Sequence, residues 1–390
     1  MIYPNRMKNL MAEGIFLKLH DIKEQLHREG KEVINLSVGS PDLPPEKYVM
    51  DALVEQCKVE ANYRYAIKDM DELRQAAANW YKRRFDVTLD ADTEISSLLG
   101  SQEGLAHICL ALTDEKDIVM VHNPGYPVYH AGPQIAKNIL YPMPTRENSA
   151  LIDFDRIPKR IAKKAKLMIV SYPNNPTTQV ADDKFFSELV QFAKKYNIIV
   201  IHDNAYCELT FDDYKAGSFL QIDGARDVGI EMNSLSKTYN LAGMRVGFAL
   251  GNKDILKCVS SIKSHMDYGI FLPIQKAAIA ALEGDQSCVE RTRAAYQRRR
   301  DILCDGLNSI GWKVEKPKAT MFVWAKLPEG YSNSNDFVMK MAKETGVIVT
   351  PGSAFGEKGE GYVRMALVAS EKQIEKVIEN LRKSDLFITD

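Results

Sequence analysis

The stretch from Val228 to Gly247 reads VGIEMNSLSKTYNLAGMRVG and is the strongest indication of the fold. It begins with a short run of mostly apolar residues, 228–232, which passes directly into polar ones. Three earlier runs have the same form: Ile118 to Val121, Leu167 to Val170 and Ile198 to Ile201. Such runs are typical of strands buried on both faces, and amphipathic stretches separate them. The sequence therefore predicts an α/β domain with a parallel sheet.

A polar cluster follows each of these four runs, at the point where the strand should end. In chain order the clusters read HNPGYP, SYPNNP, HDNAY and NSLSK. Ligands in open α/β sheets bind beyond the carboxyl ends of the strands. We therefore expect the four clusters to converge on one crevice.

Lys237 is the main candidate for chemistry. A lone lysine after a strand is usually a solvated surface residue, but this one stands between hydroxyls and precedes Arg245 by eight residues. Its amine is suited to forming an imine with an aldehyde. Arg245 and the hydroxyls of Ser234 and Ser236 are suited to binding a phosphate ester.

Three further positions become candidates for a binding site once this lysine is considered. The sequence GSQ at 100–102 opens an apolar stretch typical of a helix, whose first N–H groups would form an anion site or an ordinary cap. Asp203 follows the run 198–201 and is either a cap of the next turn or a functional carboxylate in the expected crevice. Arg364 lies in an otherwise apolar run, so it needs a salt bridge or an anionic ligand.

The length of 390 residues favours two domains. After about Gly284 the alternating pattern gives way to a long charged helix, ERTRAAYQRRRDILCDGL. A strand at 320–326, a helix around 335–343 and strands near Val347 and Val363 should follow. We predict a large domain over 46–284 and a smaller α+β domain formed by 14–45 and 285–390, to which the segment 31–36 contributes a strand.

Composition excludes several classes of function. Fifty-one basic and 52 acidic residues give a formal charge of -1, so the sequence has no excess of positive charge that would favour binding to nucleic acid or an acidic membrane. No apolar run approaches the roughly 20 residues of a membrane span, and the N-terminus lacks a signal peptide's apolar core. The six dispersed cysteines favour free thiols in a reducing compartment, with no metal site. We expect a soluble cytoplasmic protein.

The segment 234–247 resembles the SxSKxxxxxGxRxG signature of fold-type I pyridoxal-phosphate enzymes, the aspartate aminotransferase superfamily. The resemblance extends from about Asn35 to Leu367, with the motifs in the family's order. It implies a mostly parallel seven-stranded sheet between helices, a smaller α+β domain, a homodimer, and pyridoxal phosphate held by Lys237 as a Schiff base.

The resemblance also assigns the rest of the cofactor site. Backbone amides of Ser101 and Gln102 would bind the phosphate, together with Ser234, Ser236 and Arg245. Asp203 would face the ring nitrogen. Tyr126 would stack on the ring. Asn175 and Tyr206 would donate hydrogen bonds to its phenolic oxygen.

Substrate contacts and a partner contact are implied as well. Arg364 and the loop at Gly39, together with Asn175, match the residues that bind the substrate α-carboxylate. Tyr65 resembles the tyrosine that reaches the phosphate of the neighbouring subunit, and Tyr63 is the alternative because the glycine that usually follows is missing.

The function that this resemblance implies is transfer of an amino group between an L-amino acid and a 2-oxo acid. GSQEGLAH and SYPNNPTT look most like the branch that contains LL-diaminopimelate aminotransferase. However, Gln102 replaces the branch's usual lysine, and Lys68 and Asp69 stand where a glutamate is common, so the substrate stays open. A carbon–sulfur β-lyase uses the same motifs, and a non-catalytic sensing domain is an alternative of another class. A nicotinamide enzyme is disfavoured because GxGxxG is missing.

Overall fold

A seven-stranded sheet forms the centre of the computed structural model, which describes residues 4–10 and 15–387. The strand order is β2-β8-β7-β6-β5-β3-β4. The bounds are β2 (Ile95–Leu98), β3 (Ile118–Val121), β4 (Ile139–Pro142), β5 (Ala165–Ser171), β6 (Ile199–Asp203), β7 (Gly229–Ser234) and β8 (Gly247–Gly251). β8 is antiparallel to both of its neighbours, and the other pairs are parallel. The predicted α/β class with a mostly parallel seven-stranded sheet is therefore confirmed.

The four runs predicted from the sequence are β3, β5, β6 and β7, and they lie side by side in the sheet. Their residues alternate between two hydrophobic clusters. Met168 and Val170 of β5 pack into one cluster, and Leu167 and Ile169 into the other. Burial on both faces explains why these strands are continuously apolar.

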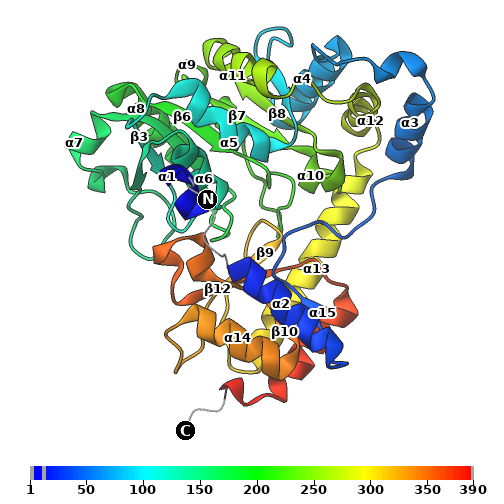
Figure 1. The fold of residues 1–390 in the computed structure, drawn as a ribbon, viewed down its shortest axis with the longest axis vertical. Coiled ribbons are helices and arrows are strands. Elements are labelled where there is room, and N and C mark those ends of the chain that lie inside the picture. The colour runs from blue at the N-terminus through cyan, green and yellow to red at the C-terminus, as the bar shows by residue number, and fades with distance from the viewer. Residues whose placement is uncertain (1–3, 11–14, 388–390) are drawn as a thin grey trace.

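Helices cover both faces of the sheet (Figure 1). One cluster takes residues from α4 (Asp71–Phe85), α8 (Asp183–Tyr196) and α12 (Leu272–Glu283). The other takes residues from α5 (Ser101–Leu112), α6 (Val128–Ile135) and α11 (Lys253–Met266). The remaining helices of this part are α3 (Lys47–Cys57), α7 (Lys159–Ala162), α9 (Ala225–Val228) and α10 (Leu235–Thr238).

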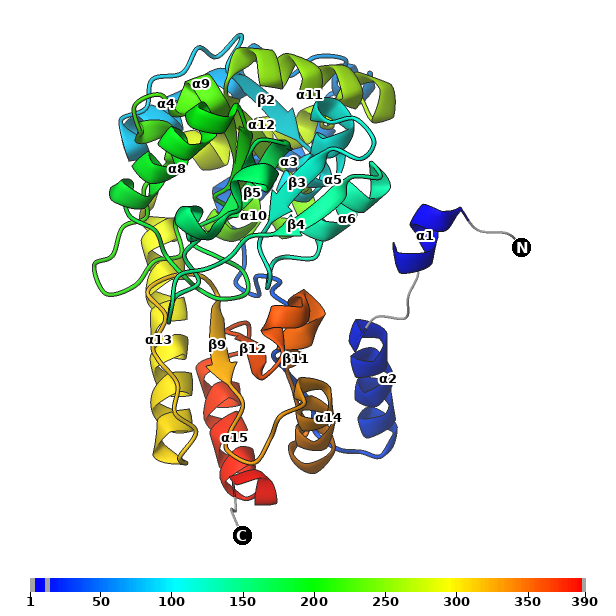
Figure 2. The same cartoon turned by 90° about the vertical axis from the view of Figure 1, so that its left-hand side faces the viewer.

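The smaller α+β part lies below the sheet (Figure 2). It holds a three-stranded antiparallel sheet, β11-β12-β9, and a parallel pair, β1-β10. Its strands are β1 (Ile34–Asn35), β9 (Phe322–Lys326), β10 (Val347–Ile348), β11 (Thr350–Pro351) and β12 (Tyr362–Ala366). Its helices are α2 (Ile15–Arg28), α13 (Ser287–Ser309), α14 (Ser334–Thr345) and α15 (Glu371–Arg382), and α1 (Asn5–Leu10) precedes them in the chain.

The segment 31–36 joins this smaller part, because Ile34 of β1 pairs with Val347 of β10. The hydrophobic cluster of the smaller part also includes Tyr206 and Phe211, so it reaches the segment that follows β6. The domain limits at 46, 284 and 285 stay predictions, and positions 14 and 388–390 of the predicted small domain lie outside the described residues. No helix in the described part of the chain is long and apolar enough to cross a membrane.

Candidate active site

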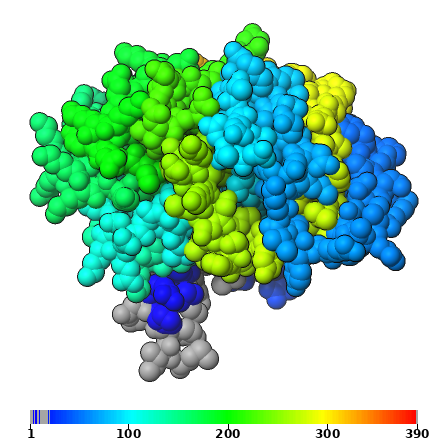
Figure 3. Space-filling model, turned by 90° about the horizontal axis from the view of Figure 1, so that it is seen from above, coloured from blue at the N-terminus to red at the C-terminus, as the bar shows by residue number. Residues whose placement is uncertain are grey.

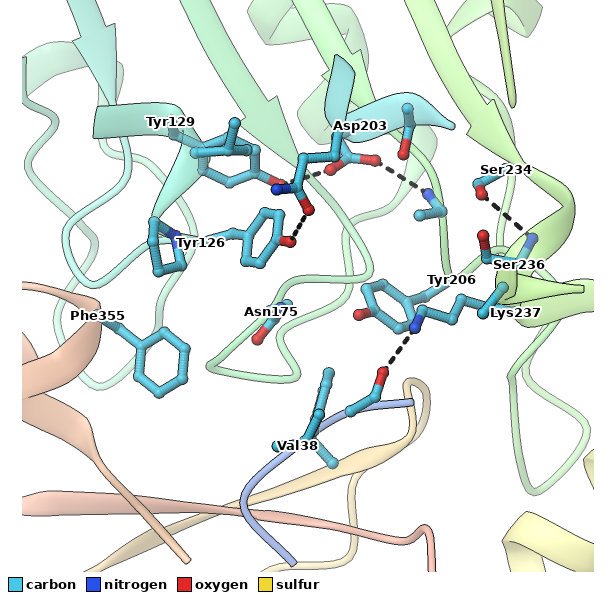
Figure 4. Close-up of a pocket in the computed structure, with 18 of the residues that line it drawn as sticks. Val38, Tyr126, Tyr129, Asn175, Asp203, Tyr206, Ser234, Ser236, Lys237 and Phe355 are labelled. Atoms are coloured by element: carbon cyan, nitrogen blue, oxygen red, sulfur yellow. Dashed lines mark hydrogen bonds between the residues drawn. The ribbon is translucent and has the colours of Figure 1, made fainter. Parts of the chain in front are cut away.

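A cavity of about 580 Å³ lies between the carboxyl ends of the central strands and the smaller part. Each of the four polar clusters predicted to converge contributes to its wall. Of the predicted site residues, twelve line the cavity: Gly39, Ser101, Gln102, Tyr126, Asn175, Asp203, Tyr206, Ser234, Ser236, Lys237, Arg245 and Arg364. Figure 4 shows how several of them point toward one another.

Lys237 lies on α10, the short helix that directly follows β7. Its Nζ donates a hydrogen bond of 2.6 Å to the carbonyl oxygen of Gly39 (Figure 4). Burial, together with the cations Arg364 and Arg245, lowers the pKa of Lys237 to about 8, although Asp203 opposes the change. The cavity thus contains an amine that loses its proton far more readily than a surface lysine does.

A cradle for an anion lies at the start of α5. Glycine is needed at two places, since a Cβ on Gly100 would collide with the Arg245 guanidinium and one on Gly247 would come within 2.7 Å of the Ser101 nitrogen. The first N–H groups of a helix have no partners within it, and they attract negative charge. Ser234, the strand partner of Gly247, and Ser236 line the same cavity. This set of donors fits the phosphate of the cofactor that the resemblance implies.

Asp203 is the last residue of β6 and is buried. Its carboxylate accepts a 2.7 Å hydrogen bond from the Tyr129 hydroxyl and a 3.2 Å bond from the Ala205 N–H (Figure 4). Burial raises the pKa of Asp203, and the bond from Tyr129 opposes that rise. A carboxylate in this position fits a pyridine nitrogen, whose proton it would stabilise.

Arg364 on β12 brings the smaller part into the cavity. Its Nη1 donates to Asn175 Oδ1 and its Nη2 to the Ser37 carbonyl oxygen, each at 2.8 Å. Its buried Nε has no hydrogen-bond partner among the described residues. Because burial of an uncompensated polar group is costly, such a guanidinium suits an anionic ligand.

Sequence reasoning missed several residues that the cavity contains. Tyr129 lies in the first turn of α6, three residues after Tyr126, and its N–H donates a 2.9 Å bond to the Tyr126 carbonyl oxygen. Its place just after the HNPGYP cluster could have indicated it. Ser37 and Phe355 carry no sequence signal, because their relation to Arg364 arises only in the folded chain. The side chain of Gln102 also has a partner that was not predicted: it accepts a 2.6 Å bond from the Tyr126 hydroxyl.

Tyr65 and Tyr63 do not line the cavity of their own chain. Tyr65 packs edge-on against Tyr268, and Tyr63 against Phe271, with ring centroids 5.4 Å and 5.3 Å apart. Asp69, one of the residues that stand where the branch commonly has a glutamate, already has partners within the chain. Its carboxylate accepts hydrogen bonds from the N–H and the hydroxyl of Ser97.

Known proteins resemble this chain over nearly its whole length. Residues 31–381 match the family model described as aminotransferase class I and II. The chain is 46% identical over 371 residues to LL-diaminopimelate aminotransferase of Moorella thermoacetica, covering 95% of each, and 44% identical over 376 residues to that of Syntrophobacter fumaroxidans, covering 96% and 97%.

Solved structures show the same relationship. The substrate-bound structure of BacF from Bacillus subtilis matches with a TM-score of 0.95 and 36% identity, covering 100% of this chain and 99% of the other. A probable N-succinyldiaminopimelate aminotransferase from Thermus thermophilus matches with a TM-score of 0.90 and 34% identity, covering 95% and 99%. The chain therefore belongs to the class I and II aminotransferase family and is a pyridoxal-phosphate-dependent aminotransferase.

Proposed function

We propose that Lys237 binds pyridoxal phosphate covalently and moves the proton that transamination requires. The observation that carries this proposal is the shared cavity, which Lys237, Asp203, Arg245 and Arg364 all line. When bound, pyridoxal phosphate supplies a ring that withdraws the electron pair left on the substrate Cα. Every other requirement of the reaction falls to side chains of this protein.

The residues around the cavity divide into groups that would hold the cofactor. The backbone N–H groups of Ser101 and Gln102 would bind the phosphate, together with Ser234, Ser236 and Arg245. Asp203 would hold the proton on the ring nitrogen. Tyr126 would stack on the ring, and Asn175 and Tyr206 would donate to its phenolic oxygen. Support for the last pair is that Asn175 uses its oxygen to accept from Arg364, which leaves its amide N–H groups for another acceptor.

Arg364 and Lys237 would act on the substrate. Both contact the segment 37–39: Arg364 donates to the Ser37 carbonyl and Lys237 to the Gly39 carbonyl. Arg364 would therefore hold the α-carboxylate close to the Lys237 amine, whose Nζ would take the proton from Cα. An ordinary lysine pKa of about 10.4 is too high for a general base at neutral pH. The lowered pKa of about 8 supports this role for Lys237.

The substrates would be an L-amino acid and a 2-oxo acid. Because relatives at 46% and 44% identity are named LL-diaminopimelate aminotransferases, LL-diaminopimelate is the first amino acid to test. The test is a half-reaction screen, in which single L-amino acids are mixed with the holoenzyme while the absorbance of the lysine-bound cofactor is followed. A substrate should abolish that absorbance without any acceptor, and a 2-oxo acid should then restore it. If no amino acid changes the absorbance, the proposal is wrong.

We also propose that two copies of the chain form a homodimer in the cytoplasm. An aromatic surface supports the dimer: Tyr65 is 80% exposed, Tyr63 64% and Tyr268 51%. The segments that carry these rings, near residues 63–67 and 266–271, are packed together. In the view from above, the blue early part of the chain borders the yellow-green part near residues 260–270 (Figure 3). Contiguous exposed apolar surface of this kind marks an interaction site.

Sedimentation of the holoenzyme tests the dimer. We expect a particle of twice the chain mass, and we expect Tyr65→Asp to produce monomers with weaker cofactor binding. A fully active monomer would contradict the proposal. The cytoplasmic location is supported by the six cysteines, all of which are free thiols.

A further inference from the structure

The guanidinium of Arg364 lies between two phenyl rings. Its Cζ is 4.1 Å from the ring centroid of Phe322 and 4.5 Å from that of Phe355. Arg364 is 5% exposed and both rings are 1% exposed, so water is excluded from this contact. The two hydrogen bonds at the guanidinium's edge go to uncharged oxygens, those of Asn175 and Ser37.

Among the residues that the structure describes, no carboxylate is in hydrogen-bond contact with this buried cation. Burial lowers the pKa of Arg364 to about 10, so the guanidinium still carries its proton at neutral pH. The face of an aromatic ring is electronegative and attracts a cation, most strongly where water is absent. The two rings therefore offset part of the cost of burial but do not occupy the hydrogen-bonding edge, as a carboxylate would.

Phe355 also connects Arg364 to the other wall of the cavity. It is the last residue of a short 3₁₀ turn, Gly352–Phe355, and its carbonyl oxygen accepts a 2.8 Å bond from the N–H of Gly125. Three residues later, the Lys358 N–H donates to Asn123 Oδ1 at 3.1 Å. The loop that carries Tyr126 and the turn that carries Phe355 are thus fastened together, and their two rings face the same cavity (Figure 4).

We propose that Phe355 and Phe322 are positioning residues for the substrate carboxylate: their rings fix the plane of the Arg364 guanidinium and face its charge, which keeps the cation free to bind an anion. This inference rests on the proposed role of Arg364. Phe355 is the better residue to test, because Phe322 also packs against Tyr206 and over Gly39.

The experiment compares ligands with and without a carboxylate. Propionate and propylamine are titrated into the holoenzyme by calorimetry, for the wild type and for Phe355→Leu, which keeps an apolar side chain but removes the aromatic face. The Kd of propionate should rise about tenfold, and that of propylamine should not change. The KM of the amino acid should rise to a similar extent with kcat changed less than about twofold, because binding rather than chemistry is affected.

Phe337→Leu is the matched control, since Phe337 is a fully buried ring of the smaller part that packs against Trp312. It should lower the melting temperature but leave propionate binding unchanged. Wild-type affinity of Phe355→Leu for propionate, or an equal loss in Phe337→Leu, would overturn the proposal. If Phe355→Leu does not fold, Phe322→Leu is expected to show the same loss. Arg364→Gln tests the role of Arg364 separately from that of the two rings. If this variant binds propionate like the wild type, the role proposed for Arg364 itself is wrong.

Discussion

His202 and Asp203 are adjacent at the end of β6 and are both buried, yet their hydrogen-bond partners differ. The ring of His202 has an acceptor at each nitrogen: Glu231 Oε2 at 2.9 Å and the Tyr172 carbonyl at 3.1 Å. Glu231 in turn accepts from the Tyr81 hydroxyl at 2.8 Å. Further bonds to Glu231, at 2.9 Å and 2.8 Å, come from the Ser218 hydroxyl and the Phe219 N–H.

Asp203 faces the cavity on the other side of the strand, where the polar groups are incompletely paired. Arg364 Nε lacks a partner among the described residues, and the pKa of Lys237 is lowered to about 8, chiefly by burial. Burial raises the pKa of Glu231, but the hydrogen bonds around it, first that from His202, bring it below its ordinary value. The difference teaches that burial alone does not identify a functional charge. A closed set of hydrogen bonds indicates stability, and an open one indicates a ligand.

The largest effect on the cavity side should follow Lys237→Ala. Loss of the covalent attachment and of the general base should lower kcat by about 10⁴-fold. The melting temperature should not fall, because the amine contributes little to folding in this environment. Steady-state kinetics and thermal unfolding measure both, with the exposed Lys253→Ala as control. A variant with wild-type turnover would refute the role of Lys237.

Glu231→Ala should instead lower the stability of the fold strongly and kcat only weakly. Removing the Glu231 carboxylate leaves the buried groups that bond to it, on His202, Tyr81 and Ser218, without that partner. Each buried group left unpaired typically costs about 1–3 kcal/mol. The urea midpoint should drop sharply, while kcat per folded molecule should fall far less than in Lys237→Ala. If Glu231→Ala is as stable as the wild type, the closed network is not a source of stability.

The contrast predicts a pH dependence for the cofactor-free protein. The pKa of Lys237 is lowered to about 8 in the folded state from 10.5, so the unfolded chain binds more protons between these values. Stability must therefore rise with pH, and for these two pKa values the rise is about 2 kcal/mol between about pH 7 and 9.5. Urea unfolding of the wild type and of Lys237→Met measures the difference, and an equal pH response in both would show that Lys237 is not the group responsible.

Tyr129→Phe should have the smallest effect. It removes one hydrogen bond to Asp203, which raises the pKa of that carboxyl further and weakens its hold on the ring proton. A hydrogen bond to a charged group is worth about 1.5–3 kcal/mol, so kcat/KM should fall about tenfold or more. Because Tyr129 bonds to Asp203 on the cavity side of the strand, stability should change less than in Glu231→Ala. Unchanged kinetics would remove Tyr129 from the site.

The sequence predicted the cavity better than it predicted the network. The clusters after β3, β5, β6 and β7 were predictable because parallel strands bring their carboxyl ends together. The His202–Glu231 pair was not, because it depends on the register of two strands, in which these residues are direct partners. The Arg364–Asn175 contact joins residues 189 positions apart, so only the folded chain reveals it.

The most direct test of the account is to locate the cofactor chemically. Borohydride reduction of the holoenzyme, followed by digestion and mass spectrometry, identifies the amine that carries pyridoxal phosphate. The added mass is expected on the peptide that contains Lys237 and should be lost in Lys237→Ala. Reduced cofactor on another lysine, or on none, would contradict the claim that this cavity is the active site.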